Sequence, residues 1–188
     1  IKKHFSDSIQ CNVAALEVLP EKIMKAGEIL IKALVEDKKI LSCGNGGSAT
    51  ESQHFSSKLL NRYERERPPL PAMDLSNNSA TLTSIANDYH YDEIFSKQIK
   101  GLGQSGDILL AFSTRGNSKN ILCAIEAAHS RNMPVIIMTG RTGGQVPALL
   151  NERDIELRVP AIKTTRIQEI HMLMIHCLCD FIDSSLFG

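Results

Sequence analysis

The stretch Asp107-Ile-Leu-Leu-Ala-Phe-Ser-Thr-Arg-Gly-Asn-Ser118 decides how the rest of the chain is interpreted. Its apolar run, residues 108–112, has the length and composition of a buried strand rather than of a helix. A polar turn follows, and apolar residues then recur at helical spacing from Ile121 to Ala128. The sequence therefore predicts a strand, a polar turn and a helix, in that order.

The polar turn is a candidate anion site. Ser113, Thr114 and Ser118 supply hydroxyl donors, and Gly116 allows the backbone to come close to a ligand. A helix that begins just after the turn directs its unpaired N–H groups and the positive end of its dipole toward it. We therefore expect the turn to bind an oxyanion, namely a phosphate ester. The alternative is that Asn117 or Ser118 only caps the helix, because Asn and Ser are common N-cap residues.

A second unit of the same design precedes the first. Residues 39–43 form a short apolar strand, Gly44-Asn-Gly-Gly-Ser48 follows at once, and a helix is predicted from Ala49 to about residue 62. Ser48 and Glu51 have capping-box spacing, which favours a helix start at this point. In parallel sheets, ligands bind beyond the carboxyl ends of the strands, so we expect the two polar turns to meet at one crevice.

The remaining elements predict a single α/β domain over residues 1–188. Helices are expected at 4–19, 21–36, 79–86, 91–101, 118–131, 145–150 and 165–187, and further strands at 71–75, 134–139 and 155–159. Strands that alternate with helices form a parallel sheet covered on both faces. The helical pair within residues 1–37 serves packing or oligomerisation, residues 38–188 form the α/β core, and strand 155–159 suits a sheet edge.

Composition and charge exclude several classes of protein. The chain is 43% hydrophobic and 22% charged, with 21 basic and 21 acidic residues, so neither nucleic acid nor an anionic membrane is an expected partner. The alternating charges of residues 62–67 indicate a solvated helix end. No signal-like or membrane-spanning run is present, and five cysteines without a Cys-x-x-Cys pair suit a reducing cytoplasm.

Three ordered motifs resemble those of the sugar isomerase (SIS) domain family. They are Ser42-Cys-Gly-Asn-Gly-Gly-Ser48, Ser113-Thr-Arg-Gly-Asn-Ser118 and Arg166-Ile-Gln-Glu-Ile-His171. Within the family, the chain resembles the branch that holds phosphoheptose isomerase and the DnaA initiator-associating protein DiaA. The resemblance implies a three-layer αβα sandwich around a five-stranded parallel sheet. It also implies a homotetramer that binds a phosphosugar at subunit boundaries.

The resemblance assigns roles to individual residues. It places phosphate on Ser113, Thr114, Arg115 and Ser118, although the third of these positions is usually Ser in the isomerases. It places sugar hydroxyls on Asn45 and Ser48, with Asp88 and Gln168 lining the sugar site. His54, Gln168 and His176 match positions that hold a zinc ion or the reacting carbons, which makes zinc a candidate cofactor and His176 the candidate acid or base.

Lys58 departs from the isomerase pattern. One turn after His54, the isomerases carry a glutamate that acts as proton-abstracting base and metal ligand, and Thr165 likewise replaces an aspartate. A lysine acts as a base only if burial or cationic neighbours lower its pKa by several units, and it ligates zinc only after losing its proton. Structural roles for the histidines are therefore the alternative to metal binding.

Two functions follow from the resemblance. Residues 61–68, 84–88, 113–115 and 172–183 look closer to DiaA, which favours a phosphosugar-binding protein that engages DnaA through protein contacts and regulates replication initiation. Leu186 and Phe187 at the end of the last helix are the candidate partner contact, or pack on their own subunit. The alternative is a phosphoheptose isomerase that makes lipopolysaccharide heptose from sedoheptulose 7-phosphate. His176 would then act with Glu51, or with a carboxylate from a neighbouring chain.

Overall fold

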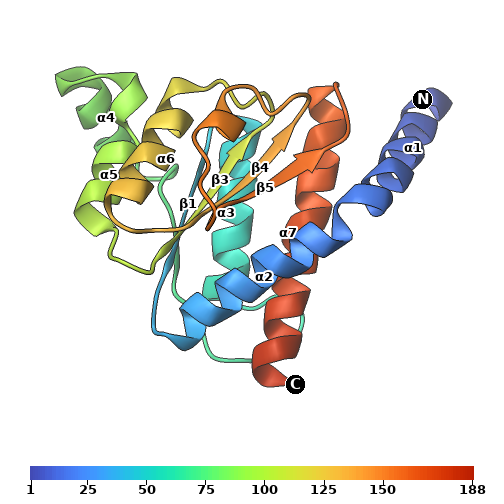
Figure 1. The fold of residues 1–188 in the computed structure, drawn as a ribbon, viewed down its shortest axis with the longest axis horizontal. Coiled ribbons are helices and arrows are strands. Elements are labelled where there is room, and N and C mark those ends of the chain that lie inside the picture. Colours follow the sequence, from blue (N-terminus) through green and yellow to red (C-terminus); the bar gives the residue numbers. More distant parts are fainter.

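A five-stranded parallel sheet forms the centre of the computed structural model, which describes all 188 residues (Figure 1). The strands are β1 (Ile40–Gly44), β2 (Ala72–Asp74), β3 (Ile108–Ser113), β4 (Val135–Gly140) and β5 (Ile155–Val159). Their order across the sheet is β2-β1-β3-β4-β5, and every neighbouring pair is parallel. The predicted α/β sandwich is confirmed, and β5 lies at a sheet edge as its alternating sequence indicates.

The helices occur close to where the sequence predicts them, except that the helix expected over 145–150 is a three-residue 3₁₀ turn and the helix expected over 91–101 is interrupted. They are α1 (Lys2–Val18), α2 (Pro20–Val35), α3 (Gly47–Leu60), α4 (Ser79–Asp88), α5 (Ser96–Leu102), α6 (Lys119–Ser130) and α7 (Thr164–Phe187), with short 3₁₀ turns η1 (Tyr91–Glu93) and η2 (Val146–Ala148). The single helix expected over 91–101 is divided into η1 and α5. Ile94 and Phe95 between them are 2% and 1% exposed, so their burial fixes the bend that interrupts the helix.

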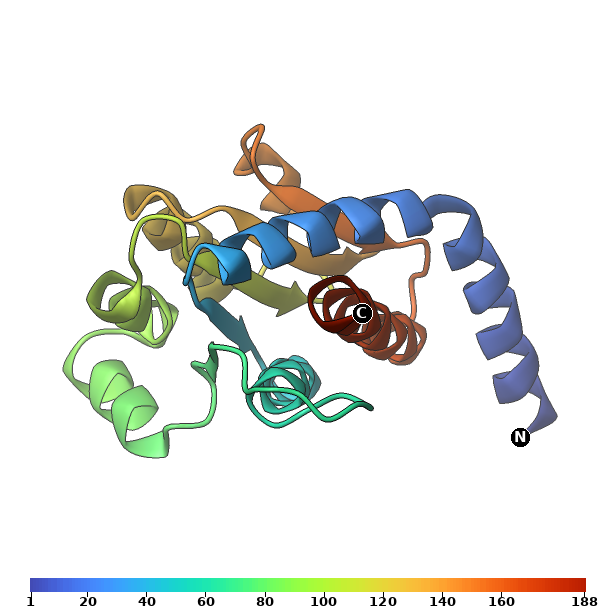
Figure 2. The same cartoon turned by 90° about the horizontal axis from the view of Figure 1, so that it is seen from below.

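Alternate residues of each central strand enter two separate cores. Ile108, Leu110 and Phe112 of β3 pack into the cluster beneath α2, α3 and α7, whereas Leu109 and Ala111 pack into the cluster beneath α5 and α6. Because side chains alternate across a strand, a strand that is apolar on both faces is covered on both. Helix α1 extends away from these layers, and both views show it projecting beyond the sheet and its covering helices (Figures 1 and 2).

The register between β1 and β3 sets the position of the two polar turns. Gly44 of β1 pairs with Phe112 of β3. Along the opposite edge of β3, Ser113 pairs with Thr139 of β4. The strands therefore end at the same level of the sheet. The turns that follow Gly44 and Ser113 consequently begin side by side, as the sequence predicts.

Helix α7 owes its apolar character to packing inside the protein. It is long and apolar enough, by length and composition alone, to cross a membrane. In the structure nine of its residues are buried, and it packs against α2 and α3. A helix in the core of a globular domain has the same composition as a spanning helix, so this feature indicates a core helix.

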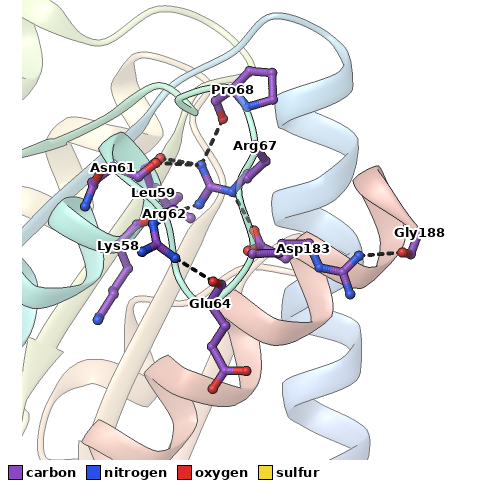
Figure 3. A network of polar contacts seen from close by, with 10 residues as sticks. Lys58, Leu59, Asn61, Arg62, Glu64, Arg67, Pro68, Asp183 and Gly188 are labelled. Atoms are coloured by element: carbon purple, nitrogen blue, oxygen red, sulfur yellow. Dashed lines mark hydrogen bonds and ion pairs between the residues drawn. The ribbon is translucent and has the colours of Figure 1, made fainter.

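The prediction of a solvated helix end at residues 62–67 is wrong for Arg67. Its guanidinium is fully buried and donates from Nε to Oδ1 of Asp183 at 2.7 Å (Figure 3). The same group donates to the carbonyl oxygens of Leu59 and Lys58, both at 2.8 Å. Those carbonyls end α3 and have no partner within the helix. Arg67 therefore caps α3 and joins it to α7, a role that alternating charge in the sequence does not reveal.

Removing this guanidinium should destabilise the protein strongly. Arg67→Ala leaves Asp183 buried and unpaired, which costs about 3–5 kcal/mol, and should lower the urea midpoint with an unchanged m-value. Arg62→Ala is the matched control, because the Arg62 side chain is 48% exposed and its contacts, with the Glu66 carboxylate and the Glu64 carbonyl, lie on the surface. Its effect should stay within about 0.5 kcal/mol. Equal losses of stability in the two variants would show that Arg67 stabilises the protein no more than a surface arginine does.

Candidate functional site

A small polar cavity lies at the carboxyl ends of β1 and β3. It has a volume of about 220 Å³ and is lined by Asn45, Ser48, Phe112, Ser113, Thr114, Arg115 and Ser118. All four residues expected to bind phosphate therefore meet two of those expected to bind sugar hydroxyls. The convergence of the two turns, which the sequence predicts from strand order alone, is present within one chain.

The donors of this cavity are free to bind a ligand. Ser118 is the N-cap of α6, yet its side chain makes no capping hydrogen bond. The Asn117 side-chain oxygen accepts instead from the backbone N–H of Gln145 at 3.1 Å. The alternative that Asn117 or Ser118 only caps the helix is therefore not what the structure shows. Of the hydroxyls in the turn, that of Ser113 accepts from the N–H of Gly116 at 3.2 Å, which leaves its proton available.

Asn45 is less free than the sequence suggests. Its amide forms a reciprocal pair with Asn120, each Nδ2 donating to the other's Oδ1 at 2.8 Å. The hydroxyl of Tyr91 also donates to Asn45 Oδ1, at 3.1 Å. Asn120 is 2% exposed and thus ties the two turns together from below. Sequence reasoning missed it; a polar residue among the apolar positions of α6 was the available signal.

A polar seam runs along the contact between α3 and α7. It consists of three pairs of neighbours: Gly47 with Gln168, Glu51 with His171, and His54 with His176. Both members of each pair occur later in the chain than those of the pair before. The two helices therefore run side by side in the same direction, and the seam leads from the turn after β1 toward Lys58.

The central pair, Glu51 and His171, must share a proton. His171 Nε2 lies 3.1 Å from the carbonyl oxygen of Thr139, which can only accept, so that nitrogen carries a hydrogen. Its Nδ1 lies 3.2 Å from Glu51 Oε2. A hydrogen bond across this gap needs one further proton, held by either the carboxyl or the ring. Both side chains are buried, and Glu51 Oε1 has no partner.

This pairing corrects the predicted capping box. The N-cap of α3 is Gly46, at a φ of 56° that favours glycine, and no side chain caps the helix. Glu51 points toward the buried imidazole of His171 instead of toward the backbone N–H groups at the helix start. Those N–H groups are exposed to solvent and do not require a side-chain partner. Ser48 and Glu51 therefore have separate roles: Ser48 lines the cavity and Glu51 pairs with His171.

The outer pair, His54 and His176, is a candidate proton-transfer centre. Their Nε2 atoms are 3.2 Å apart, and the Tyr63 ring lies beside His176 at 5.8 Å between ring centroids. Burial lowers the pKa of His54 below its ordinary value, and the charges of Lys58 and His176 lower it further. His54 is consequently held neutral near pH 7, the state in which an imidazole accepts a proton.

Zinc does not fit the donors that one chain offers here. Two nitrogens 3.2 Å apart could share a tetrahedral ion, since zinc–nitrogen bonds of about 2.0–2.1 Å place such ligands roughly 3.3 Å apart. No further His, Cys, Asp or Glu completes a cluster of three. Gln168 lies eight residues before His176 on α7, or about 12 Å along the helix. Lys58 brings a positive charge where a third ligand would be needed.

Several expected site residues lie elsewhere. Asp88 is exposed at the end of α4 and does not line the cavity. Leu186 packs partly buried against the protein's own core, whereas Phe187 is exposed at the end of α7, with its ring centroid 5.9 Å from the Arg67 guanidinium. The largest hollow, about 1070 Å³ between α3, β2, α4 and α5, contains none of the predicted site residues.

The histidine pair and the phosphate cavity face different sides of α3. His54 follows Ser48 by six residues, which at 3.6 residues per turn places the two side chains about 120° apart around the helix axis. The cavity is lined by Ser48 and not by His54 or His176. A single chain therefore holds two polar centres on α3 without joining them.

Known proteins match this chain over most of its length. A family model described as the SIS domain matches residues 4–140. A protein from Chromohalobacter salexigens named phosphoheptose isomerase is 60% identical over 98% of this chain and 94% of its own length. Another of that name from Alteromonas mediterranea is 58% identical over 100% of this chain and 94% of its own. The solved phosphoheptose isomerase from Francisella tularensis is 46% identical, with a TM-score of 0.95 over 97% of this chain and 96% of that chain.

These matches favour one of the two readings of the sequence. The relatives carry the isomerase name, and nothing in them points to the initiator-associating branch. The closer resemblance to DiaA that residues 61–68 and 172–183 suggest is therefore not supported.

The charge of Lys58 can be tested through His54. Lys58→Met removes one of the causes that hold down the pKa of His54, so that pKa should rise in a proton NMR titration of the imidazole Cε1–H. Lys100→Met, which removes an exposed charge from α5, is the control and should leave the titration in place. A pKa of His54 that is the same in wild type and Lys58→Met would contradict the electrostatic coupling.

Proposed function

Because this chain belongs to the SIS domain family, and within it to the phosphoheptose isomerase family, we propose that it interconverts sedoheptulose 7-phosphate and D-glycero-D-manno-heptose 7-phosphate. The product would supply heptose for lipopolysaccharide. The observation that carries the proposal is the cavity at Ser113 and Ser118, whose donors stand free at the start of α6. The polar side chains that line the cavity suit the phosphate of a sugar better than any apolar ligand.

In the proposed reaction the cavity binds and orients the substrate. The phosphate accepts hydrogen bonds from the turn hydroxyls, and the N-terminus of α6 adds the positive end of its dipole. Arg115 contributes a guanidinium where the isomerases usually have Ser, and guanidinium groups match phosphate with two parallel hydrogen bonds. Asn45 and Ser48 on the facing turn then lie on the side of the cavity that the sugar enters.

The chemistry requires proton transfer between neighbouring carbons. A base removes a proton from C1 of the open-chain ketose, an enediol forms, and a proton returns at C2 while the oxygens exchange theirs. We assign proton uptake and return to His176 together with His54. Their Nε2 atoms are 3.2 Å apart, so one proton can be hydrogen-bonded between them. Glu51 is too deeply buried against His171 to reach a substrate directly. It supports this step only indirectly, through its contact with His171.

The histidine pair and the phosphate cavity are joined, in this proposal, by assembly into a homotetramer. Helix α1 exposes four large apolar side chains at helical spacing: Phe5, Ile9, Val13 and Leu16. Such a stripe suits contact with another copy of the chain. A neighbouring subunit would bring its own histidine pair, or a carboxylate such as Asp88, to the cavity. The balanced charge of the chain suits a cytoplasmic enzyme without direct nucleic-acid or membrane contact.

A phosphosugar-binding protein without turnover is the second candidate, and Lys58 is the observation that favours it. The position that carries the base in the isomerases here carries an ammonium group. Such a protein would act through a partner, with DnaA as the specific possibility and the end of α7, Leu186 and Phe187, as the contact. Turnover of purified protein decides between the two candidates.

Turnover and binding should respond to different substitutions. Ser113→Ala with Ser118→Ala should raise KM for sedoheptulose 7-phosphate roughly 100-fold or more, because two hydrogen bonds to a charged group are lost and each contributes about 1.5–3 kcal/mol. His176→Ala should abolish turnover while leaving calorimetric binding of the phosphosugar intact. Ser130→Ala, whose hydroxyl bonds only its own helix, is the control. Wild-type protein that binds the sugar but never converts it would refute the enzymatic proposal.

Mixed assemblies can show whether two subunits form one site. The Ser113→Ala/Ser118→Ala variant lacks the phosphate donors, and His176→Ala lacks the proton-transfer group. If a site combines the cavity of one subunit with the histidines of another, co-expression of the two variants should restore turnover at sedoheptulose 7-phosphate concentrations too low for the serine variant alone. Mixtures assembled from separately folded homo-oligomers should show no such gain. No recovery on co-expression would place both functions within a single chain.

A further inference from the structure

A second polar hollow lies beside the phosphate cavity, and apart from Arg115, which lines both, its residues have no role in the proposed reaction. It has a volume of about 640 Å³, and its lining includes Arg115, Asn117, Arg141, Thr142 and Pro160. These residues come from the loops after β3, β4 and β5, at the carboxyl edge where ligands bind in parallel sheets. Arg115 lines both spaces, so the hollow adjoins the cavity directly.

The hollow carries an uncompensated positive charge. Its lining contains two guanidinium groups and no acidic residue. The charged groups nearby are already paired: Glu156 with Arg158, and Lys163 with Asp7 at 2.9 Å. Arg115 and Arg141 are exposed, and neither forms an ion pair within the chain. Two unpaired guanidiniums around one hollow favour an anion, even though the chain as a whole has no net charge.

The loops that present these two arginines are locked together by their backbones. The N–H of Gln145 donates to the carbonyl of Gly116 at 3.0 Å, and a Cβ on Gly116 would lie 1.8 Å from the carbonyl oxygen of Gly143. Only glycine allows so close an approach at this φ of 66°. The backbone segments that carry Arg115 and Arg141 are therefore held at fixed positions relative to one another.

Arg141 is itself held in an unusual conformation. Its φ is 54°, and the other non-glycine residues with positive φ are an Asp and an Asn, which tolerate that region. The Arg141 N–H donates to the carbonyl of Ala161 at 2.9 Å, which fixes it to the connection between β5 and α7. Bulky residues in this region often occur at functional sites, because surrounding contacts must enforce the conformation.

We propose that this hollow is a second anion site, which binds a phosphoryl group through Arg115 and Arg141. Guanidinium groups bind phosphate through paired, charge-assisted hydrogen bonds. Asn117 adds a free amide N–H₂, because its oxygen is occupied by Gln145, and Thr142 adds a hydroxyl. The ligand class is a phosphorylated small molecule, and a compound with two phosphates can occupy the hollow and the neighbouring cavity together.

Calorimetry with inorganic pyrophosphate tests the site without any turnover. The measurement uses the full chain with Ser113→Ala and Ser118→Ala, so that binding in the cavity is weakened. Adding Arg141→Asn should weaken pyrophosphate binding about tenfold or more, as expected for loss of a charged hydrogen-bonding partner. Asn tolerates positive φ, so this substitution keeps the loop conformation. Arg141→Lys, which keeps the charge, should lose less affinity.

Arg153→Asn in the same background is the matched control. Arg153 is exposed and lies away from the hollow, and its removal changes the net charge by the same amount. Pyrophosphate binding should change less than about twofold. An equal loss of pyrophosphate affinity in the Arg141 and Arg153 variants would show that the effect comes from net charge alone. That result would overturn the proposal. So would an affinity that Arg141→Asn leaves unchanged. Because no substrate is turned over, neither result bears on the isomerase proposal.

Discussion

The in-register parallel pairing of β1 with β3 is the constraint on which the candidate site depends. Gly44 lies opposite Phe112, so the two strands end together and their turns start side by side. Each turn is short and leads directly into a helix, which aligns the N-termini of α3 and α6 on the same edge of the sheet. Hydrogen bonds between Asn45 and Asn120 then hold the two turns against each other. Slipping the pairing by one residue would turn each side chain of β1 to the opposite face and separate Ser48 from Ser113. The anion cavity is therefore a property of strand register before it is a property of any single side chain.

The polar seam between α3 and α7 is the second organising feature, and it places polar groups where a core would ordinarily be apolar. Glu51 and His171 are almost completely buried and contact one another through Oε2 and Nδ1, and the Thr139 carbonyl accepts from the other ring nitrogen. Arg67 and Asp183 make a similar buried contact at the far end of the same two helices. Buried ion pairs often stabilise a protein no better than apolar residues of equal volume, so stability alone does not account for them. They fix the rotation of α3 against α7, and that rotation sets which atoms of His54 and His176 face each other.

Lys58 is the point at which family membership and local chemistry differ. The relatives named phosphoheptose isomerase make an isomerase the simplest proposal, whereas the ammonium group one turn beyond His54 replaces the expected carboxylate. Burial lowers the pKa of His54, and the charge of Lys58 lowers it further, so that imidazole is neutral. A neutral imidazole pair can transfer a proton without a metal ligand at this position. In the proposed isomerase, the histidine pair would therefore remain as the candidate for proton transfer although the carboxylate is absent.

The sequence by itself determined the fold class, nearly all of the elements and the anion turn, because apolar periodicity, glycine turns and strand order are local or follow from simple topological rules. It also placed Ser113, Thr114, Arg115 and Ser118 together with Asn45 and Ser48. It did not reveal that Arg67 is buried, that Glu51 pairs with His171 instead of capping α3, or that His54 faces away from the cavity. These facts depend on the rotation of one helix against another and on partners more than a hundred residues away. Only tertiary packing decides them, because the same charged or polar residue is solvated on one face of a helix and buried on the next.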